Sequence, residues 1–201
     1  MPRKNLIRTN LHPYHVTIRS NNREWFELPL REVWDICIEA LKFANRQYPV
    51  KLQAFVLMSN HYHLMLWTPN CDLDKFMYVF NSKISKSIRK KTGRINRIFG
   101  DRYKWSVIED VNYFRTCLRY IYQNPVKANI VLRCEEYVYS SVFYVIRDFD
   151  LDIDWFCPLL EDREEFIEWM NKTEENSVNI KKALQRPIFK IPNQRSSRRK
   201  G

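Results

Sequence analysis

LQAFVLM at residues 52–58 and HYHLMLW at residues 61–67 are two apolar runs, and only Ser59-Asn60 separates them. The length of each run matches that of an ordinary β-strand. Two such runs joined by two turn-forming residues are typical of a β-hairpin. We therefore expect an antiparallel hairpin at residues 52–67.

The flanking sequence adds strands and amphipathic helices on both sides of this hairpin. Apolar residues recur at helical spacing before and after it, and Pro49 lies just beyond the first helical stretch. Asp110 is a suitable N-cap for a third helix, which should end near Asn124 because Pro125 follows. The expected elements are strands at residues 14–19 and 103–108 and helices at residues 30–46, 72–91 and 111–124. The order β-α-β-β-α-β-α predicts an α+β domain with a ferredoxin-like antiparallel sheet and helices packed on one face.

The composition favours a folded domain without a nucleotide-binding loop. The 201 residues include 45% apolar and 14% aromatic residues, which is enough for a hydrophobic core. The three glycines, Gly93, Gly100 and Gly201, form neither GxGxxG nor GxxxxGK[ST]. Chemistry that depends on ATP or on a dinucleotide is therefore not expected.

The chain is basic, with 34 Lys and Arg against 23 Asp and Glu and a formal net charge of +11. Such a charge is typical of proteins that bind nucleic acid, although a basic surface without that role is the alternative. Residues 75–100 contain no acid. We expect this stretch to neutralise DNA phosphates, the alternative being a solvated helix face. Its candidate DNA-binding residues are Lys83, Lys86, Arg89 and Lys90.

Charge also divides the chain into three segments. Residues 1–147 form the main domain, and residues 148–180 form an acidic C-terminal helical extension. Residues 181–201 form a basic tail without any acid, which we expect to be flexible. We expect the tail to add phosphate contacts without belonging to the active site.

Cysteine usage and the N-terminus indicate a cytoplasmic location. The five cysteines are scattered and form no CxxC pair, which is typical of reduced thiols. The basic start MPRKNLIRTN is followed by no apolar segment, so no signal peptide is expected. No apolar run approaches about 18 residues, so no membrane span is expected either.

His61 and His63 stand two residues apart within the second run of the hairpin. Side chains at this spacing share one face of a strand and lie about 7 Å apart, so both imidazoles can bind one metal ion. The alternative is a pair of histidines on a half-exposed strand, each satisfied by hydrogen bonds. The spacing alone is a weak signal for a metal site.

Tyr120 and Asn124 are four residues apart, so they lie on one face of the predicted third helix. A tyrosine next to two imidazoles is a candidate nucleophile, and an amide oxygen is a candidate metal ligand. The alternative is that Tyr120 is an aromatic residue at the edge of the core and Asn124 ends the helix. Judged alone, this segment favours the structural alternative.

Four blocks of the sequence resemble the REP-associated tyrosine transposases, relatives of the single-tyrosine insertion-sequence transposases among the HUH endonucleases. The resemblance covers residues 12–145, and His61-Tyr62-His63 resembles the HUH motif of the superfamily. Asn124 replaces the glutamine of many insertion-sequence enzymes, which favours the REP-associated branch. The blocks are YHVTIR at residues 14–19, MSNHYHL at 58–64, RYK at 102–104 and YIYQNPVKA at 120–128.

The resemblance implies a single-tyrosine transposase domain at residues 1–147, with Tyr120 as the catalytic nucleophile. It implies a divalent metal, Mg²⁺ or Mn²⁺, held by His61, His63 and Asn124. Such an enzyme nicks and rejoins single-stranded DNA at hairpin-flanked sites through a 5′-phosphotyrosine intermediate. Further residues stand where the family contacts DNA, namely Arg19, Asn21 and Arg102.

Two other functions stay open at this point. One is a domesticated protein that binds a DNA hairpin without turnover. The other is a metal-dependent nuclease that uses water, with Tyr120 in a structural role. The oligomeric state is open as well, because the related insertion-sequence enzymes act as dimers whereas the REP-associated branch resembles monomers.

Overall fold

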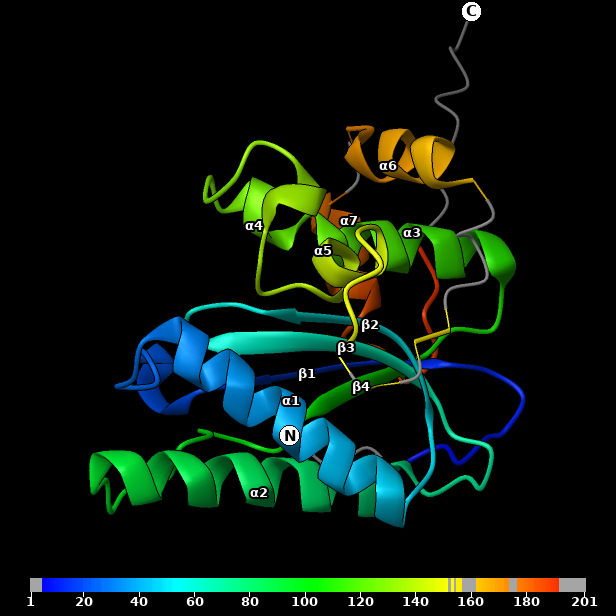
Figure 1. Ribbon diagram of the computed structural model, residues 1–201. Coiled ribbons are helices and arrows are strands. Elements are labelled where there is room, and N and C mark those ends of the chain that lie inside the picture. The colour runs from blue at the N-terminus through cyan, green and yellow to red at the C-terminus, as the bar shows by residue number, and fades with distance from the viewer. Residues whose placement is uncertain (1–4, 152, 154, 157–161, 174–176, 192–201) are drawn as a thin grey trace, which may run out of the picture.

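A single four-stranded sheet organises the computed structural model, which describes residues 5–151, 153, 155–156, 162–173 and 177–191. All pairings are antiparallel and the strand order is β2-β3-β1-β4, as in a ferredoxin-like fold (Figure 1). The predicted α+β class is confirmed. In chain order the elements are β1 (Tyr14–Arg19), η1 (Asn21–Arg23), α1 (Leu30–Gln47), β2 (Lys51–Leu57), β3 (His61–Trp67), α2 (Leu73–Thr92), β4 (Lys104–Val107), α3 (Val111–Tyr122), α4 (Asn124–Lys127), η2 (Cys134–Glu136), α5 (Ser141–Val145), α6 (Arg163–Asn171) and α7 (Ser177–Ala183).

Helices cover both faces of the sheet, so the prediction that they pack on one face is corrected. Tyr62 and Leu64 of β3 face the layer formed by α1 and α2 (Figure 1). Val56 and Met65 face the opposite layer, where α3 contributes Leu118 to the core. The physical reason lies in β2 and β3, which are apolar at consecutive positions and therefore need cover on each face.

Helix α3 begins where the sequence predicts. The carboxylate of Asp110 accepts hydrogen bonds from the backbone N–H of Asn112 at 2.8 Å and of Tyr113 at 3.1 Å, as an N-cap does. The helix ends at Tyr122, and Pro125 lies inside the short helix α4 that follows. Proline fits there because the first turn of a helix needs no N–H donor.

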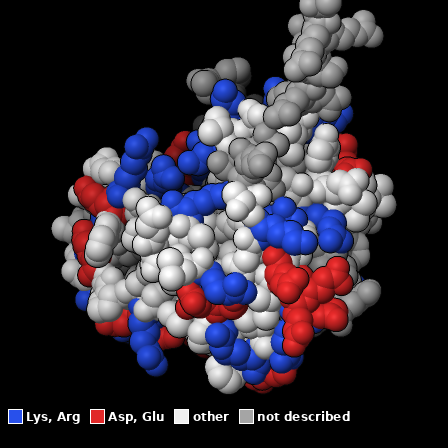
Figure 2. Space-filling view, turned by 90° about the horizontal axis from the view of Figure 1, so that it is seen from above, with Lys and Arg blue, Asp and Glu red and all other residues white. Residues whose placement is uncertain are grey.

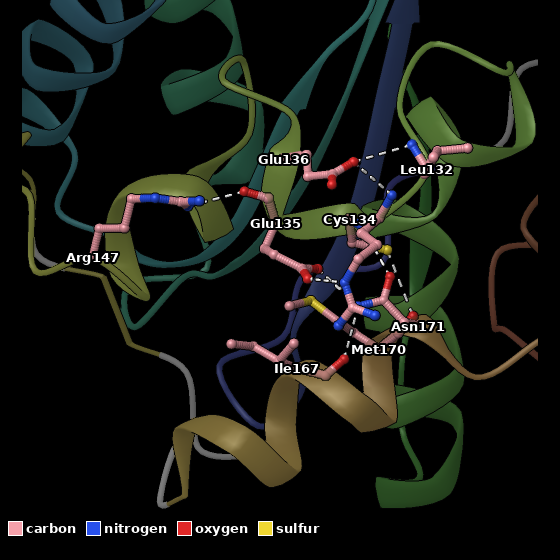
Figure 3. Close-up of polar contacts among 9 residues, drawn as sticks. Leu132, Cys134, Glu135, Glu136, Arg147, Ile167, Met170 and Asn171 are labelled. Atoms are coloured by element: carbon pink, nitrogen blue, oxygen red, sulfur yellow. Dashed lines mark hydrogen bonds and ion pairs between the residues drawn. The ribbon is translucent and has the colours of Figure 1, made fainter.

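Helix α6 of the C-terminal extension docks on η2 and on the end of α3. The Asn171 amide donates to the Glu135 carboxylate at 2.8 Å and accepts from the backbone N–H of Cys134 at 3.0 Å (Figure 3). The Gln123 amide donates to the carbonyl of Met170 at 2.9 Å. Phe166 and Trp169 of α6 share one core cluster with α3, so the extension stabilises the helix that carries Tyr120.

Residues 187–189 lie along the outer edge of β4. The backbone N–H of Val107 donates to Pro187 at 2.8 Å, and the N–H of Phe189 donates to Val107 at 2.9 Å. Phe189 is fully buried, and its ring packs against Tyr113. The prediction of a flexible tail is therefore wrong for residues 181–191, while residues 192–201 lie outside the described part.

The other edge of the sheet, formed by β2, is covered as well. The N–H of Leu57 donates to the carbonyl of Tyr139 at 2.9 Å, and the carbonyl of Leu52 accepts from Phe156 at 2.8 Å. The chain thus satisfies backbone groups on both of its sheet edges, which limits pairing with other chains.

Two smaller expectations concern membranes and thiols. None of the described helices has both the length and the apolar character that crossing a membrane requires. Cys37, Cys71, Cys117 and Cys134 are free thiols, as predicted, and Cys157 lies outside the described residues.

We predict that Phe189→Ala lowers the free energy of unfolding by about 3–5 kcal/mol, because it empties a fully buried aromatic site. Val178→Ala is the matched control, since Val178 is 64% exposed and its truncation should cost less than about 0.5 kcal/mol. Urea unfolding of both variants provides the measurement. Equal stability of Phe189→Ala and the parent chain would show that this segment is not part of the core.

Candidate active site

The antiparallel register of β1 and β3 gathers the polar side chains of the site on one face of the sheet. Arg19 lies opposite His61, and Thr17 lies opposite His63. Side chains alternate along a strand, so His15 shares this face with both histidines. It is the face covered by α3, away from α1 and α2.

His61 is held by the residue that precedes it. Its Nδ1 lies 2.8 Å from Oδ1 of Asn60, while Nδ2 of Asn60 donates to the carbonyl of Arg23 at 2.8 Å. Because the amide nitrogen is used as a donor, Oδ1 must accept and His61 Nδ1 must carry the proton. The Nε2 of His61 therefore keeps its lone pair.

His63 has a partner that the sequence did not reveal. Its Nδ1 lies 2.9 Å from Nε2 of His15, and the two rings stack with their centroids 5.2 Å apart. Both side chains are buried, with 5% and 1% of their surface exposed. His15 stands in the YHVTIR block, but only the pairing of β1 with β3 could have linked it to the histidine motif.

Tyr120 packs its ring against the histidines. The ring centroids of Tyr120 and His63 lie 5.7 Å apart and those of Tyr120 and His15 lie 6.4 Å apart. Only 4% of Tyr120 is exposed. Asn124, one turn further on, donates through Nδ2 to the carbonyl of Tyr120 at 2.8 Å, which leaves its Oδ1 as the free end of the amide. The structure thus brings together Tyr120, His61, His63 and the helix turn of Asn124.

Burial sets the protonation states at this site. Desolvation lowers the pKa of His15 to about 3 and that of His61 to about 4, and it holds the pKa of His63 well below its usual value. Arg19 and Lys181 lower the pKa of His61 and His63 further, because they repel the positive charge of a protonated imidazole. Burial raises the pKa of Tyr120 to about 12, a shift that Arg19 partly offsets. Near neutral pH the histidines are therefore neutral and the tyrosine keeps its proton.

The cations around this cluster come from three different parts of the chain. Arg19 ends β1, Lys181 belongs to α7, and Lys127 places its Nζ 5.5 Å from the ring centroid of Tyr120. Lys181 was expected in a flexible tail, whereas here it belongs to α7 and lowers the pKa of His61 and His63. A positive field of this kind suits an anion such as a phosphodiester.

The basic residues of α2 are not brought to this cluster. Lys83 and Lys90 line a groove between α1 and α2 together with the acidic residues of α1. Lys86 and Arg89 are exposed on the same helix, in the layer on the opposite side of the sheet. Figure 2 looks onto the other side of the molecule, that of α3 to α7, where basic side chains form separate patches with acidic ones beside them. A run of basic residues in a sequence does not show which face of the sheet its helix covers.

Asn21 follows β1, at the end of the sheet where His61 begins β3. Arg102 is exposed in the loop that precedes β4. Asn21 donates its backbone N–H to Ile98 at 2.8 Å, and Gly100 donates to Arg19 at 3.1 Å. A Cβ on Gly100 would come within 3.1 Å of the Asn21 Cα, so any larger residue would crowd this contact. Asn21 is thereby fixed next to Arg19.

The donor set fits a divalent metal ion. His61 and His63 each use Nδ1 in a hydrogen bond, and Asn124 uses Nδ2, so the two Nε2 atoms and the Asn124 Oδ1 are the atoms that could hold a metal ion. Such neutral ligands suit Mn²⁺ and accommodate Mg²⁺. Within the described residues, no three His, Cys, Asp or Glu side chains form a metal-binding group. The candidate ligands here are two histidines and an asparagine, a combination outside that definition.

Comparisons with known proteins place the chain in a family and relate its fold to solved structures. The sequence model of the family described as "Transposase IS200 like" matches residues 8–124. The structure of a REP-associated tyrosine transposase bound to a REP hairpin superposes with a TM-score of 0.61 at 20% identity, over 78% of this chain and 92% of that one. A protein from Deinococcus radiodurans R1, assigned as a transposase, gives a TM-score of 0.42 at 15% identity, over 65% and 96% of the two chains. No curated protein matches the sequence.

We predict that the metal-free protein loses stability as the pH falls from about 7 to about 5. The unfolded chain takes up protons on its histidines near pH ~6.5, whereas the folded chain does not. Stability is therefore fully present above that pH and declines below it, by up to about 1.4 kcal/mol per pH unit for each buried histidine. His15→Gln should make the decline shallower. Urea unfolding in the presence of a chelator measures it, with His12→Gln as the control, and an equally steep decline in both variants would contradict the assignment.

Proposed function

Because this chain belongs to the IS200-like transposase family, we propose that it cuts and rejoins single-stranded DNA with Tyr120 as the nucleophile. Family membership implies a DNA-cleaving enzyme in general terms. The observation that carries the finer proposal is the packing of the Tyr120 ring against His63, at 5.7 Å between centroids. Two other tyrosines of α3 are less suitable, because Tyr122 donates its hydroxyl to Gln53 and Tyr113 packs on Phe189.

In the reaction the scissile phosphate of the DNA is transferred to the tyrosine and then to another 3′-hydroxyl. The Tyr120 oxygen bonds to phosphorus, the bond to the 3′-oxygen breaks, and the phenol loses its proton while the leaving 3′-oxygen gains one. The product is a 5′-phosphotyrosine that keeps the energy of the original phosphodiester. Attack by another 3′-hydroxyl then rejoins the strand without ATP, which fits a chain that lacks nucleotide-binding loops.

In this proposal a divalent metal, Mg²⁺ or Mn²⁺, is held by His61, His63 and Asn124. When bound, it supplies Lewis-acid polarisation of the scissile phosphate. The three protein ligands are neutral, so the negative charge that balances the ion comes from the DNA. Arg19 adds positive charge at the same end of the sheet and favours ionisation of Tyr120.

The substrate we propose is single-stranded DNA next to a hairpin. The solved relative with a TM-score of 0.61 was captured with a REP hairpin, which supports placing this chain near the REP-associated branch. The rim formed by the exposed Arg19 and Arg102 and the half-buried Asn21 is suited to contacting the strand beside the scissile phosphate. The basic residues of α2 are candidates for contacts to more distant phosphates.

We predict that Tyr120→Phe abolishes the covalent protein–DNA adduct, by at least about 1000-fold, while DNA affinity stays nearly unchanged. The change removes one oxygen and keeps the ring that packs against His63. Denaturing gels of the protein with hairpin-flanking oligonucleotides and Mn²⁺ measure the adduct. Tyr113→Phe, on the same helix, is the matched control and should form it normally.

The same experiment separates the other two functions. A hairpin-binding protein without turnover gives neither adduct nor cleavage in the parent chain. A nuclease that uses water cleaves without an adduct, and its cleavage survives Tyr120→Phe. Either result would refute the nucleophile proposed here.

We predict that the cations at the site contribute more to binding a short single strand than those of α2. Each phosphate contact on single-stranded DNA changes the slope of log K against log salt by about 0.7. Lys127→Ala should therefore flatten the slope by about 0.7, whereas Lys86→Ala should leave it unchanged for an oligonucleotide that spans only the cleavage site. Fluorescence anisotropy across a salt series measures both, and the reverse ranking would assign the strand to the α2 side.

A further inference from the structure

His15 is a buried polar residue that the proposed chemistry does not yet use. It stands on β1 with 1% of its surface exposed, and its Nε2 lies 2.9 Å from Nδ1 of His63. Its cross-strand neighbour on β4 is Ser106, which is fully buried. Burying an imidazole costs free energy that an apolar residue of the same size would not.

The direction of this hydrogen bond decides which nitrogen of His63 keeps a free lone pair. Both rings are neutral, so each carries one proton and one lone pair. When His63 donates from Nδ1 to His15, its own lone pair is on Nε2. The His61–Asn60 bond has the same effect on His61, where the proton is fixed on Nδ1. Each histidine of the motif thus has a separate neighbour at Nδ1.

We propose that His15 is a positioning residue: its Nε2 accepts the Nδ1–H of His63 and thereby fixes the ring and the tautomer in which His63 binds metal through Nε2. The proposal rests on the metal role of His63 given above. His15 is not itself a third ligand, because its Nε2 is engaged by His63. Hydrogen bonds of this kind at a ligating histidine raise metal affinity by orienting the ring.

The electrostatics of the pocket keep the imidazoles neutral, as this hydrogen bond requires. Arg19 and Lys181 place positive charge near His61 and His63. A second proton on either ring is disfavoured there. His15 can hold His63 without adding charge, because burial keeps His15 neutral as well.

Two substitutions that differ by one methylene group test the proposal. His15→Gln places an amide oxygen about as far from the backbone as Nε2 and can accept the Nδ1–H of His63. His15→Asn is polar as well but too short to reach it. Ser106→Ala is the control, since it removes the buried polar neighbour of His15 and leaves the contact with His63 intact.

The full chain is measured with two readouts. Nitrogen-15 NMR of the metal-free protein reports which nitrogen of His63 is protonated, and calorimetric titration with Mn²⁺ alone reports the metal Kd. For His15→Asn we expect a mixed His63 tautomer and a Kd about 10- to 100-fold weaker. His15→Gln should restore most of both values, and Ser106→Ala should match the parent chain. Thermal unfolding confirms that each variant is folded.

Failure of this inference and failure of the proposed function give different results. An unchanged His63 tautomer and an unchanged Mn²⁺ Kd in His15→Asn would overturn the positioning role. A parent chain that binds no Mn²⁺, but whose His63 tautomer still depends on His15, would confirm the contact and refute the metal role. An equal loss of Mn²⁺ affinity in His15→Gln and His15→Asn would also overturn the positioning role, since the hydrogen bond would then not be the cause.

Discussion

The antiparallel register between β1 and β3 is the constraint on which the site depends. It pairs Thr17 with His63, and side chains alternate along both strands. A slip by one residue would turn His15 and Arg19 towards α1 and α2 and bring Tyr14 and its apolar neighbours to the site. The register is secured by residues that have no part in the chemistry, because Tyr14, Val16 and Ile18 must stay buried in the core beneath α1 and α2. Apolar burial on one face thus specifies polar geometry on the other.

The two layers of helices have different roles as a result. Helices α1 and α2 close one core and carry surface charge, whereas α3 brings Tyr120 to the histidines and is itself held by α6, α7 and Phe189. The site combines neutral imidazoles, a tyrosine whose pKa burial raises, and cations from β1 and α7. A pocket of this charge suits an anion, and Arg19 by itself already favours loss of the Tyr120 proton.

The sequence predicted those features of the fold and the site that depend on residues close together in the chain. The hairpin, the N-cap Asp110 and the spacing of His61 and His63 depend on neighbouring residues, and all are present in the structure. The family match confirms the resemblance to the single-tyrosine insertion-sequence transposases. His15 could not be identified because its contact with His63 joins residues 48 positions apart. Cover on both faces of the sheet, the position of α2 and the docking of residues 187–189 are likewise set by tertiary packing, which a run of charged residues does not reveal.

The contact between β4 and residues 187–189 also determines when the sheet is finished during synthesis. All four strands have left the ribosome before the segment that covers β4 is translated. Until then the nascent chain presents the N–H and C=O of Val107 as an open edge, the kind of surface on which unfinished proteins associate. A transcript truncated shortly before codon 187 would encode every residue of the candidate site and still leave this edge uncovered. The C-terminal segment therefore limits pairing of the finished sheet with other chains, quite apart from any contact with DNA.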